Sequence, residues 1–150
     1  MDRILLPVTS QPTWASDVAA VARDIESPAE TEAIVIHVFT GDEIESTREN
    51  LNLRPDEDAS LDYLAARKAG VSATVKDLAR VGMSTRIKGV LAEGEPGSAI
   101  IASAEEEDVD RIYLYSRRRS PAGKAMFGST VQRVLLNADV PVIVLPAPTV

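Results

Sequence analysis

The chain has 150 residues, 45% of them hydrophobic and 26% charged, so it suits one compact domain and is too short for two. It has no cysteine, which excludes thiol catalysis, disulfide bonds and cysteine-ligated metal centres. Its apolar runs, such as residues 140–145, are far shorter than the roughly 20 residues that cross a bilayer. No apolar signal segment follows Asp2 and Arg3. We therefore expect a cytoplasmic protein with no membrane partner.

The net charge of −7 opposes non-specific contact with a polyanion, so no nucleic-acid partner is expected. The charge is divided unevenly along the chain. Residues 111–138 carry six basic side chains and no acidic one, which leaves −13 on the remainder. This basic segment has two interpretations: a solvated loop, or a site for a small anionic ligand or an acidic protein partner.

Residues 3–8 and 33–39 are short apolar runs, the second rich in β-branched side chains, and both are typical of strands buried on two faces. Between them, apolar side chains recur at helical spacing, which predicts a helix that buries one stripe. This helix ends at Ser27-Pro28, and the three segments form a βαβ unit. The stripe consists of Trp14, Val18, Val21, Ala22 and Ile25.

Residues 40–59 hold seven acidic side chains against two arginines and show almost no periodicity, so we expect an exposed loop there. From Ser60, apolar residues recur every three to four positions, which predicts a long helix that ends near Gly82. Gly70 lies inside this helix and costs about 1 kcal/mol relative to alanine, so we expect a break there. Residues 84–91 alternate as a strand at a sheet edge does.

A third helix is predicted to open at Glu95-Pro96-Gly97, because proline is tolerated in a first turn. Its acidic run, residues 105–108, is expected to be a solvated helix end. The rest of the chain predicts a strand over 111–115, a basic loop over 116–127, a helix over 129–138 and a last strand over 140–145. Strands that alternate with helices throughout predict an α/β fold with three layers, in which helices cover both faces of a five-stranded parallel sheet.

Ligands of such sheets bind outside the carboxyl ends of the strands, where the strand order reverses. Residues 8–11, 38–40 and 116–128 are predicted to meet at that edge. The third segment is the most informative, because its basic side chains lead into Gly128-Ser129-Thr130 at the start of a helix. The free N–H groups and the positive dipole end of a helix start attract phosphate, so we predict an anion site there.

Several of these residues also have purely structural explanations. Ser129 followed by Gln132 matches a capping box, in which both side chains satisfy their own helix terminus, and this role can coexist with phosphate contact. His37, the only histidine, lies inside an apolar strand with no second histidine or cysteine, which favours a hydrogen-bonded structural role over catalysis or metal binding. Trp14 and Tyr113 are expected in the core.

The opening RILLPV, the run IVIHV and the closing residues 134–135 and 140–144 resemble the universal stress protein family. Nucleotide-binding members carry G-x2-G-x9-G-[ST] between the fourth strand and the next helix, and that spacing here falls on Tyr115, Arg118, Gly128 and Ser129. The resemblance implies a Rossmann-like sheet of order 3-2-1-4-5, as in adenine nucleotide alpha hydrolases, and ATP or another phosphate-bearing ligand. It also implies a homodimer through the last strand, whose apolar edge needs a cover.

The chain departs from the family pattern at three places. Tyr115 and Arg118 replace two glycines, and Thr9 stands where ATP-binding relatives usually have aspartate. Tyr115 is expected to fill the space beside Gly128 or to force φ negative, and Thr9 lacks the carboxylate that relatives direct at the nucleotide. Arginines bind phosphate with bidentate geometry. We therefore expect the site to keep its preference for an anion although these substitutions damage its fit to adenosine. The cations are Arg117, Arg118, Arg119 and Lys124.

We therefore expect a non-catalytic, dimeric binding or regulatory module in stress response, with weak or lost ATP binding. One alternative is an ATP-binding switch with slow hydrolysis, and another is a basic loop that docks an acidic partner. No catalytic residue and no metal ligand is predicted. The predicted nucleotide or anion site consists of Val8, Thr9, Val38, Tyr115, Arg117, Arg118, Gly128, Ser129 and Thr130.

Overall fold

A computed structural model describes residues 1–8, 12–51, 60–116, 118–119, 125–126 and 128–146. Five parallel strands form one sheet in the order β3-β2-β1-β4-β7, which confirms the predicted order. The strands of this sheet are β1 (Asp2–Pro7), β2 (Thr31–Phe39), β3 (Ser84–Leu91), β4 (Arg111–Ser116) and β7 (Val142–Pro146). The helices are α1 (Pro12–Ile25), α2 (Gly41–Asn50), α3 (Leu61–Ala66), α4 (Ala69–Ala79), α5 (Pro96–Glu106) and α6 (Ser129–Asn137), with a short 3-10 turn at Pro28–Glu30.

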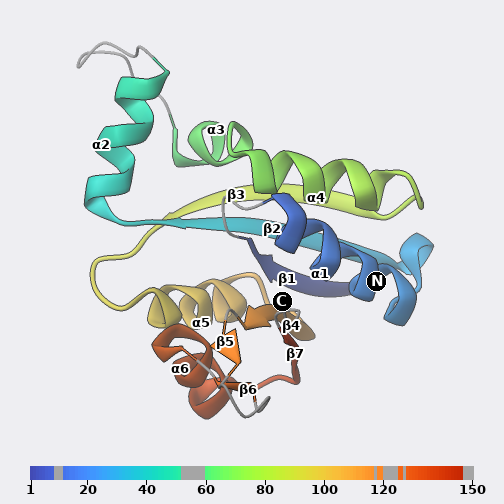
Figure 1. Cartoon of the computed structure of the whole chain (residues 1–150). Coiled ribbons are helices and arrows are strands. Elements are labelled where there is room, and N and C mark those ends of the chain that lie inside the picture. Colours follow the sequence, from blue (N-terminus) through green and yellow to red (C-terminus); the bar gives the residue numbers. More distant parts are fainter. Residues whose placement is uncertain (9–11, 52–59, 117, 120–124, 127, 147–150) are drawn as a thin grey trace.

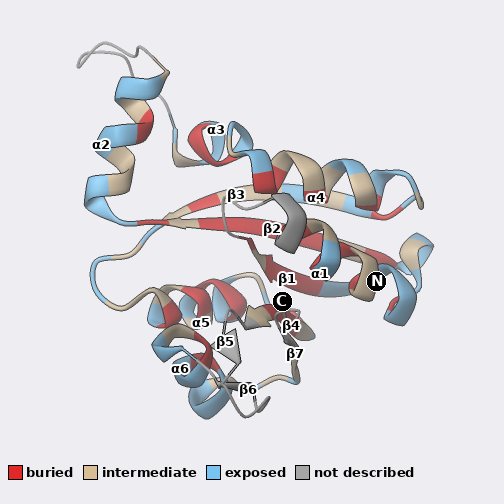
Figure 2. Ribbon diagram, viewed as in Figure 1, coloured by how far each residue is buried: buried red, intermediate tan, exposed pale blue. Residues whose placement is uncertain are grey.

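Helices cover both faces of the sheet, as the three-layer prediction requires (Figure 1). The alternation of side chains along each strand divides the core in two. Ile4 and Leu6 of β1 pack with α1 and α4, whereas Leu5 packs with α5 and α6. Figure 2 shows the buried residues concentrated along β1 and β2 in the middle of the sheet. Within the described residues, no helix has the length and apolar character that a membrane span needs.

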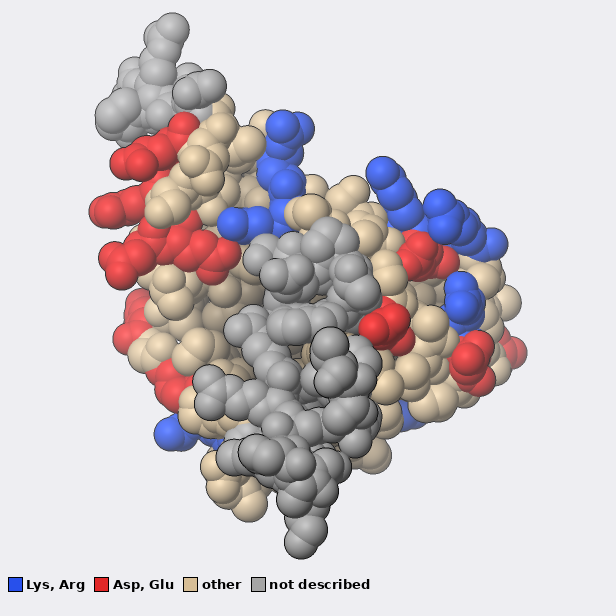
Figure 3. All heavy atoms as spheres, viewed as in Figure 1, with Lys and Arg blue, Asp and Glu red and all other residues tan. Residues whose placement is uncertain are grey.

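The prediction of a loop over residues 40–59 is wrong for its first half, because residues 41–50 form α2. Thr40 caps this helix, its hydroxyl accepting a hydrogen bond from the Glu43 amide at 3.2 Å, and acidic residues in the first turn suit the helix dipole. Ile44 and Leu51 pack against the small cluster around Phe39. Only a narrow side of α2 is apolar, and its outer face is acidic (Figure 3), so its hydrophobic periodicity is weak. Residues 52–59 lie outside the described residues.

The predicted helix over residues 60–82 is two helices. The break falls at Arg67 and Lys68, just before Gly70, which is buried in the first turn of α4. The end at Gly82 is confirmed, since this glycine has a φ of +79°, the left-handed conformation that terminates helices. The division lets α3 turn away from α4 and lie against the edge strand β3.

Strand β3 lies at the edge of the sheet, as predicted. Helix α3 closes that edge, because the Asp62 carboxylate accepts a hydrogen bond from the Gly89 amide at 2.8 Å. A side chain on Gly89 would overlap the Leu61 carbonyl group and lie 2.9 Å from the Leu61 Cβ. The close approach of α3 therefore requires glycine at this position.

The prediction of a basic loop over residues 116–127 is wrong in part. Two short strands, β5 (Arg118–Arg119) and β6 (Ala125–Met126), pair antiparallel within it. Two-residue strands leave no periodicity for a sequence pattern to detect. The last strand of the main sheet begins at Val142 rather than at residue 140. The side chain of Trp14, predicted in the core, lies outside the described residues, whereas Tyr113 is fully buried as predicted.

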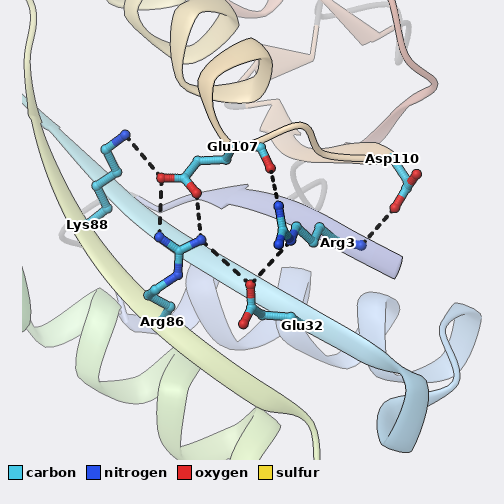
Figure 4. A network of polar contacts seen from close by, with 6 residues as sticks. All are labelled: Arg3, Glu32, Arg86, Lys88, Glu107 and Asp110. Atoms are coloured by element: carbon cyan, nitrogen blue, oxygen red, sulfur yellow. Dashed lines mark hydrogen bonds and ion pairs between the residues drawn. The ribbon is translucent and has the colours of Figure 1, made fainter. Parts of the chain in front are cut away.

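The acidic run at the end of α5 is not simply a solvated helix end. Only 13% of the Glu107 side chain is exposed, and its carboxylate accepts hydrogen bonds from Arg86 at 2.5 Å and from Lys88 at 3.3 Å (Figure 4). The hydrogen bond from Arg86, opposed by burial and reinforced by Lys88, lowers the pKa of Glu107. The network fastens the end of α5 to β3, and it continues through Glu32 to Arg3. These cations also offset the unfavourable position of an acid at a helix C-terminus.

Candidate functional site

The described residues of the predicted anion site lie at the carboxyl ends of β1, β2 and β4 and at the start of α6, with Val8 and Tyr115 on the α1 side of the core and Val38 on the α5 and α6 side. The Val8 amide donates to the Ile36 carbonyl at 2.9 Å, which extends the pairing of β1 with β2 to the point where the first loop begins. Val38 packs with the α5 and α6 side of the core, and Gly128 stands at the start of α6. Thr9 and Arg117 lie outside the described residues, and of Arg118 only the backbone, in β5, is described.

His37 links the end of β1 to α2. His37 is 5% exposed, with Nδ1 3.2 Å from the Val8 carbonyl oxygen and Nε2 2.6 Å from a carboxylate oxygen of Glu43. Lys68 lies 3.2 Å from the same Glu43 oxygen and donates to the Thr47 hydroxyl at 3.0 Å. The prediction of a buried, hydrogen-bonded His37 is confirmed. Sequence patterns do not identify its partner Glu43, because the weak periodicity of residues 40–59 predicts a loop there.

The link gives α2 a pH-dependent attachment. Burial acts to raise the pKa of Glu43, but the hydrogen bonds and charges of His37 and Lys68 together outweigh it and lower that pKa from its ordinary value. A carboxylate with a lowered pKa stabilises the fold above its unfolded-state pKa, and this contribution is lost as the pH falls through the folded-state value. We expect Glu43→Gln to cost about 1 kcal/mol at pH 6 and clearly less at pH 3, as measured by urea unfolding. An equal cost at both pH values would contradict this account.

Tyr115 lies one residue before the end of β4. Like Tyr113 two residues earlier, it points to the α1 face of the sheet, where it packs against the cluster that includes Val8 and Val18. Burial raises the pKa of its hydroxyl, and the charge of Asp17 on α1 raises it further. No atom of Tyr115 comes within 4 Å of a Cβ placed on Gly128. The alternative expectation, a negative φ at residue 115, agrees with the backbone, because among the described residues Asp108 is the non-glycine residue with a positive φ. Residues two apart in a strand share a face, and α6 covers the other face.

The start of α6 differs from the predicted capping box. Gly128 is the N-cap residue, with φ −68° and ψ 171°, and no described side chain caps the helix. Ser129 is the first helical residue, one position too late to cap it, and Gln132 joins the helix through its own amide, which donates to the Gly128 carbonyl at 3.0 Å. Gly128 and Ser129 are exposed. No side chain in the described part of the chain therefore caps the first amides of α6, and an exposed helix start of this kind is a place where an anion binds favourably.

Thr130 is engaged by a residue that the sequence analysis did not include in the site. Its hydroxyl donates to a carboxylate oxygen of Glu95 at 3.1 Å, and the other oxygen of Glu95 lies 3.1 Å from Arg133 Nε. Glu95 is the N-cap residue of α5, so its carboxylate joins the starts of two helices. Its place before Pro96 marked it as a helix start, but nothing local in sequence connects it with residue 130.

A cavity of about 670 Å³ lies at the opposite, amino edge of the sheet. Its polar centre is Glu26, whose side chain is 4% exposed and accepts hydrogen bonds from Arg111 at 2.6 and 2.8 Å and from Tyr113 at 2.5 Å. Burial, and then the hydrogen bond to Glu26, raise the pKa of Tyr113. The predicted site residues that the structure describes do not line this cavity, which is bounded by Met1, Asp2, Ile25, Glu26, Ser27, Ala29, Glu30, Thr31 and Arg111.

Comparisons with known proteins agree with this architecture. The model of the universal stress protein family matches residues 1–146, whereas a comparison with curated protein sequences finds no match. A universal stress protein from Archaeoglobus fulgidus is 24% identical, with a TM-score of 0.65 over 96% of this chain and 98% of that one. The universal stress protein from the same organism in complex with dAMP is 21% identical (TM-score 0.63; 96% and 97% covered). A family member from Arabidopsis thaliana with AMP bound is 10% identical (TM-score 0.62; 99% and 94% covered).

Proposed function

Because the chain belongs to the universal stress protein family, we propose that it is a non-catalytic, dimeric, cytoplasmic module that binds the phosphate of an adenine nucleotide weakly at the start of α6. The observation that carries the proposal is the exposed start of α6 at Gly128, where no described side chain caps the helix and no described atom lies within 4 Å of the Cβ position. Universal stress proteins of similar fold hold dAMP, cAMP and AMP. The six basic side chains of residues 111–138 add an attractive field for such a ligand.

Weak affinity follows from the first loop and from the altered glycine pattern. Thr9 offers no carboxylate to the nucleoside, and Tyr115 and Arg118 stand at two positions where relatives have glycine. Tyr115 contributes by filling the α1 side of the sheet rather than by blocking Gly128. The anion contact at α6 is therefore retained in this proposal, while the contacts that would grip adenosine are reduced.

The test is thermal unfolding of the protein with ATP, AMP, inorganic phosphate or sulfate, each at two salt concentrations. A ligand at 100 times its dissociation constant adds about 2.7 kcal/mol to the stability. We expect AMP and phosphate to stabilise the protein modestly, and added salt to weaken the effect. Gly128→Val should abolish the shift, because a branched side chain shields the first amides of α6. Gly94→Val, at a second glycine with open space around its Cβ position, should preserve it.

Two results would contradict the proposal. Equal shifts by sulfate and AMP would indicate a charge site with no preference for nucleotides, and no shift with any anion would indicate a pure interaction module. Release of phosphate from ATP above the rate of a buffer blank would favour the switch with slow hydrolysis over a non-catalytic module.

The dimeric part of the proposal rests on the two edges of the sheet. Helix α3 closes the β3 edge through Asp62, whereas β7 has only β4 as a neighbour among the described strands. An open, apolar edge strand favours pairing with a second copy. Leu136, 76% exposed, lies on the turn of α6 that leads into β7 and would extend such an interface.

Light scattering after size exclusion tests the dimer. We expect a dimer at micromolar concentration, and Leu136→Lys should shift it toward monomer. Ile25→Lys changes another exposed apolar residue, at the amino edge of the sheet, and should leave the dimer intact. A monomer in the unmodified protein, or the same effect from both substitutions, would overturn the assignment of the interface to β7.

A further inference from the structure

We infer that Glu95 is a built-in competitor for anions at the start of α6, and that it makes the site discriminate against highly charged phosphates. This inference rests on the proposed function, because it concerns the same helix start. It assigns to Glu95 a role in ligand selection beyond its place as the N-cap residue of α5.

The carboxylate of Glu95 lies where the starts of α5 and α6 meet. One oxygen accepts from the hydroxyl of Thr130, the second residue of α6, at 3.1 Å, and the other pairs with Arg133. The two helix starts are in direct contact, since a Cβ on Gly97 would lie 2.9 Å from the Thr130 carbonyl oxygen and 2.7 Å from a Glu95 oxygen. Glu95 therefore already supplies a negative charge at this junction.

The Glu95 carboxylate lies beside two helix starts, so it already interacts with the positive helix ends that would attract an incoming phosphate. Helix starts carry a partial positive charge that one anion neutralises favourably, and a second anion nearby meets Coulomb repulsion from the first. The Thr130 hydroxyl is also committed to Glu95, so it is not free to donate to phosphate. Arg133 offsets part of this effect, because its guanidinium pairs with the carboxylate.

The repulsion from Glu95 grows with the charge of the ligand. A phosphodiester such as cAMP carries one negative charge, AMP carries about two, and ATP carries more. Glu95 is therefore expected to weaken the binding of ATP most and the binding of a cyclic nucleotide least. The ligand class that the site tolerates best is a phosphate of low charge, a diester or a monoester rather than a triphosphate.

The experiment measures dissociation constants for cAMP, AMP and ATP by calorimetry at low salt and without magnesium. Glu95→Gln removes the charge and keeps the shape of the side chain, and Glu95→Ser provides a second neutral variant that still suits an N-cap. We expect both to tighten binding by about threefold for cAMP and about tenfold for AMP, with a larger gain for ATP. Arg133→Gln should weaken the binding of all three ligands. Glu93→Gln, which removes an exposed carboxylate two residues away, should change none of them.

The outcomes separate this inference from the proposed function. If the unmodified protein binds AMP and neither Glu95 variant binds it more tightly, the inference fails while the proposed function stands. If only the Glu95 variants bind, the inference stands and nucleotide binding by the natural chain fails. If no variant binds any of the three ligands, both fail. Equal gains for cAMP and ATP would overturn the charge-based discrimination.

Discussion

Replacing Gly89 with alanine should destabilise the protein more than a glycine-to-alanine substitution at any other glycine named above. The new Cβ would overlap the backbone carbonyl of Leu61, which cannot rotate away as a flexible side chain does. Either α3 moves off β3 or the strand shifts, and both responses break the hydrogen bond from the Gly89 amide to Asp62. Overpacking with this additional loss is expected to cost about 3 kcal/mol or more, which corresponds to a fall of roughly 6–12 °C in Tm.

Gly94→Ala is the matched control for this experiment. Open space surrounds its Cβ position, so a change in stability within about 0.5 kcal/mol is expected. Urea unfolding of both variants measures the difference. If Gly89→Ala proves as stable as Gly94→Ala, the close contact between α3 and the edge strand is wrong.

The second large effect is expected at Glu26. Its buried carboxylate accepts hydrogen bonds from both the Arg111 guanidinium and the Tyr113 hydroxyl. In Glu26→Gln, a side-chain NH2 group replaces one of these acceptor oxygens and faces the same donors. A charge left without its partner in a buried site costs about 3–5 kcal/mol. The expected result in urea unfolding is a loss of about 3 kcal/mol, with the fold retained at low temperature.

Asp2→Asn provides an internal comparison, because Asp2 pairs with the same guanidinium at 2.8 Å but its side chain is 59% exposed. An exposed ion pair contributes at most about 1 kcal/mol, so this variant should lose much less than Glu26→Gln. Similar losses from the two substitutions would show that burial of the Glu26 cluster does not decide its strength.

The proposed site combines an anion contact with a nearby carboxylate that limits it. No described atom lies within 4 Å of the Cβ position of Gly128 at the start of α6, and the Glu95 carboxylate accepts a hydrogen bond from the second residue of this helix, Thr130. A protein built this way responds to the charge of its ligand as well as to its shape. The acidic face of α2 lies at the same edge of the sheet and is tied to the first loop through His37 and Glu43 (Figure 1).

The sequence by itself determined the sheet and the edge where a ligand site would lie. The apolar runs 3–8 and 33–39, separated by a helical stripe, dictate parallel strands with helices on both faces, because only that arrangement buries two-sided apolar strands. The carboxyl edge then follows from chain direction, since every strand enters its helix there. Gly128 could be placed at this edge because it stands next to its own helix start, in sequence as in space.

Only the tertiary structure decided which side chains face one another at that edge. In the family spacing Tyr115 lies three positions from Arg118, but its side chain is on the sheet face opposite α6. The helix that Tyr115 contacts depends on the handedness of the crossover connections. Glu95 reaches Thr130 across 35 residues, and Glu26 reaches Tyr113 across 87. The hydrophobic periodicity of a sequence predicts which face of its own helix or strand a residue lies on. It carries no information on the distant segment packed against that face, and the partners of buried charges are therefore fixed only when the layers come together.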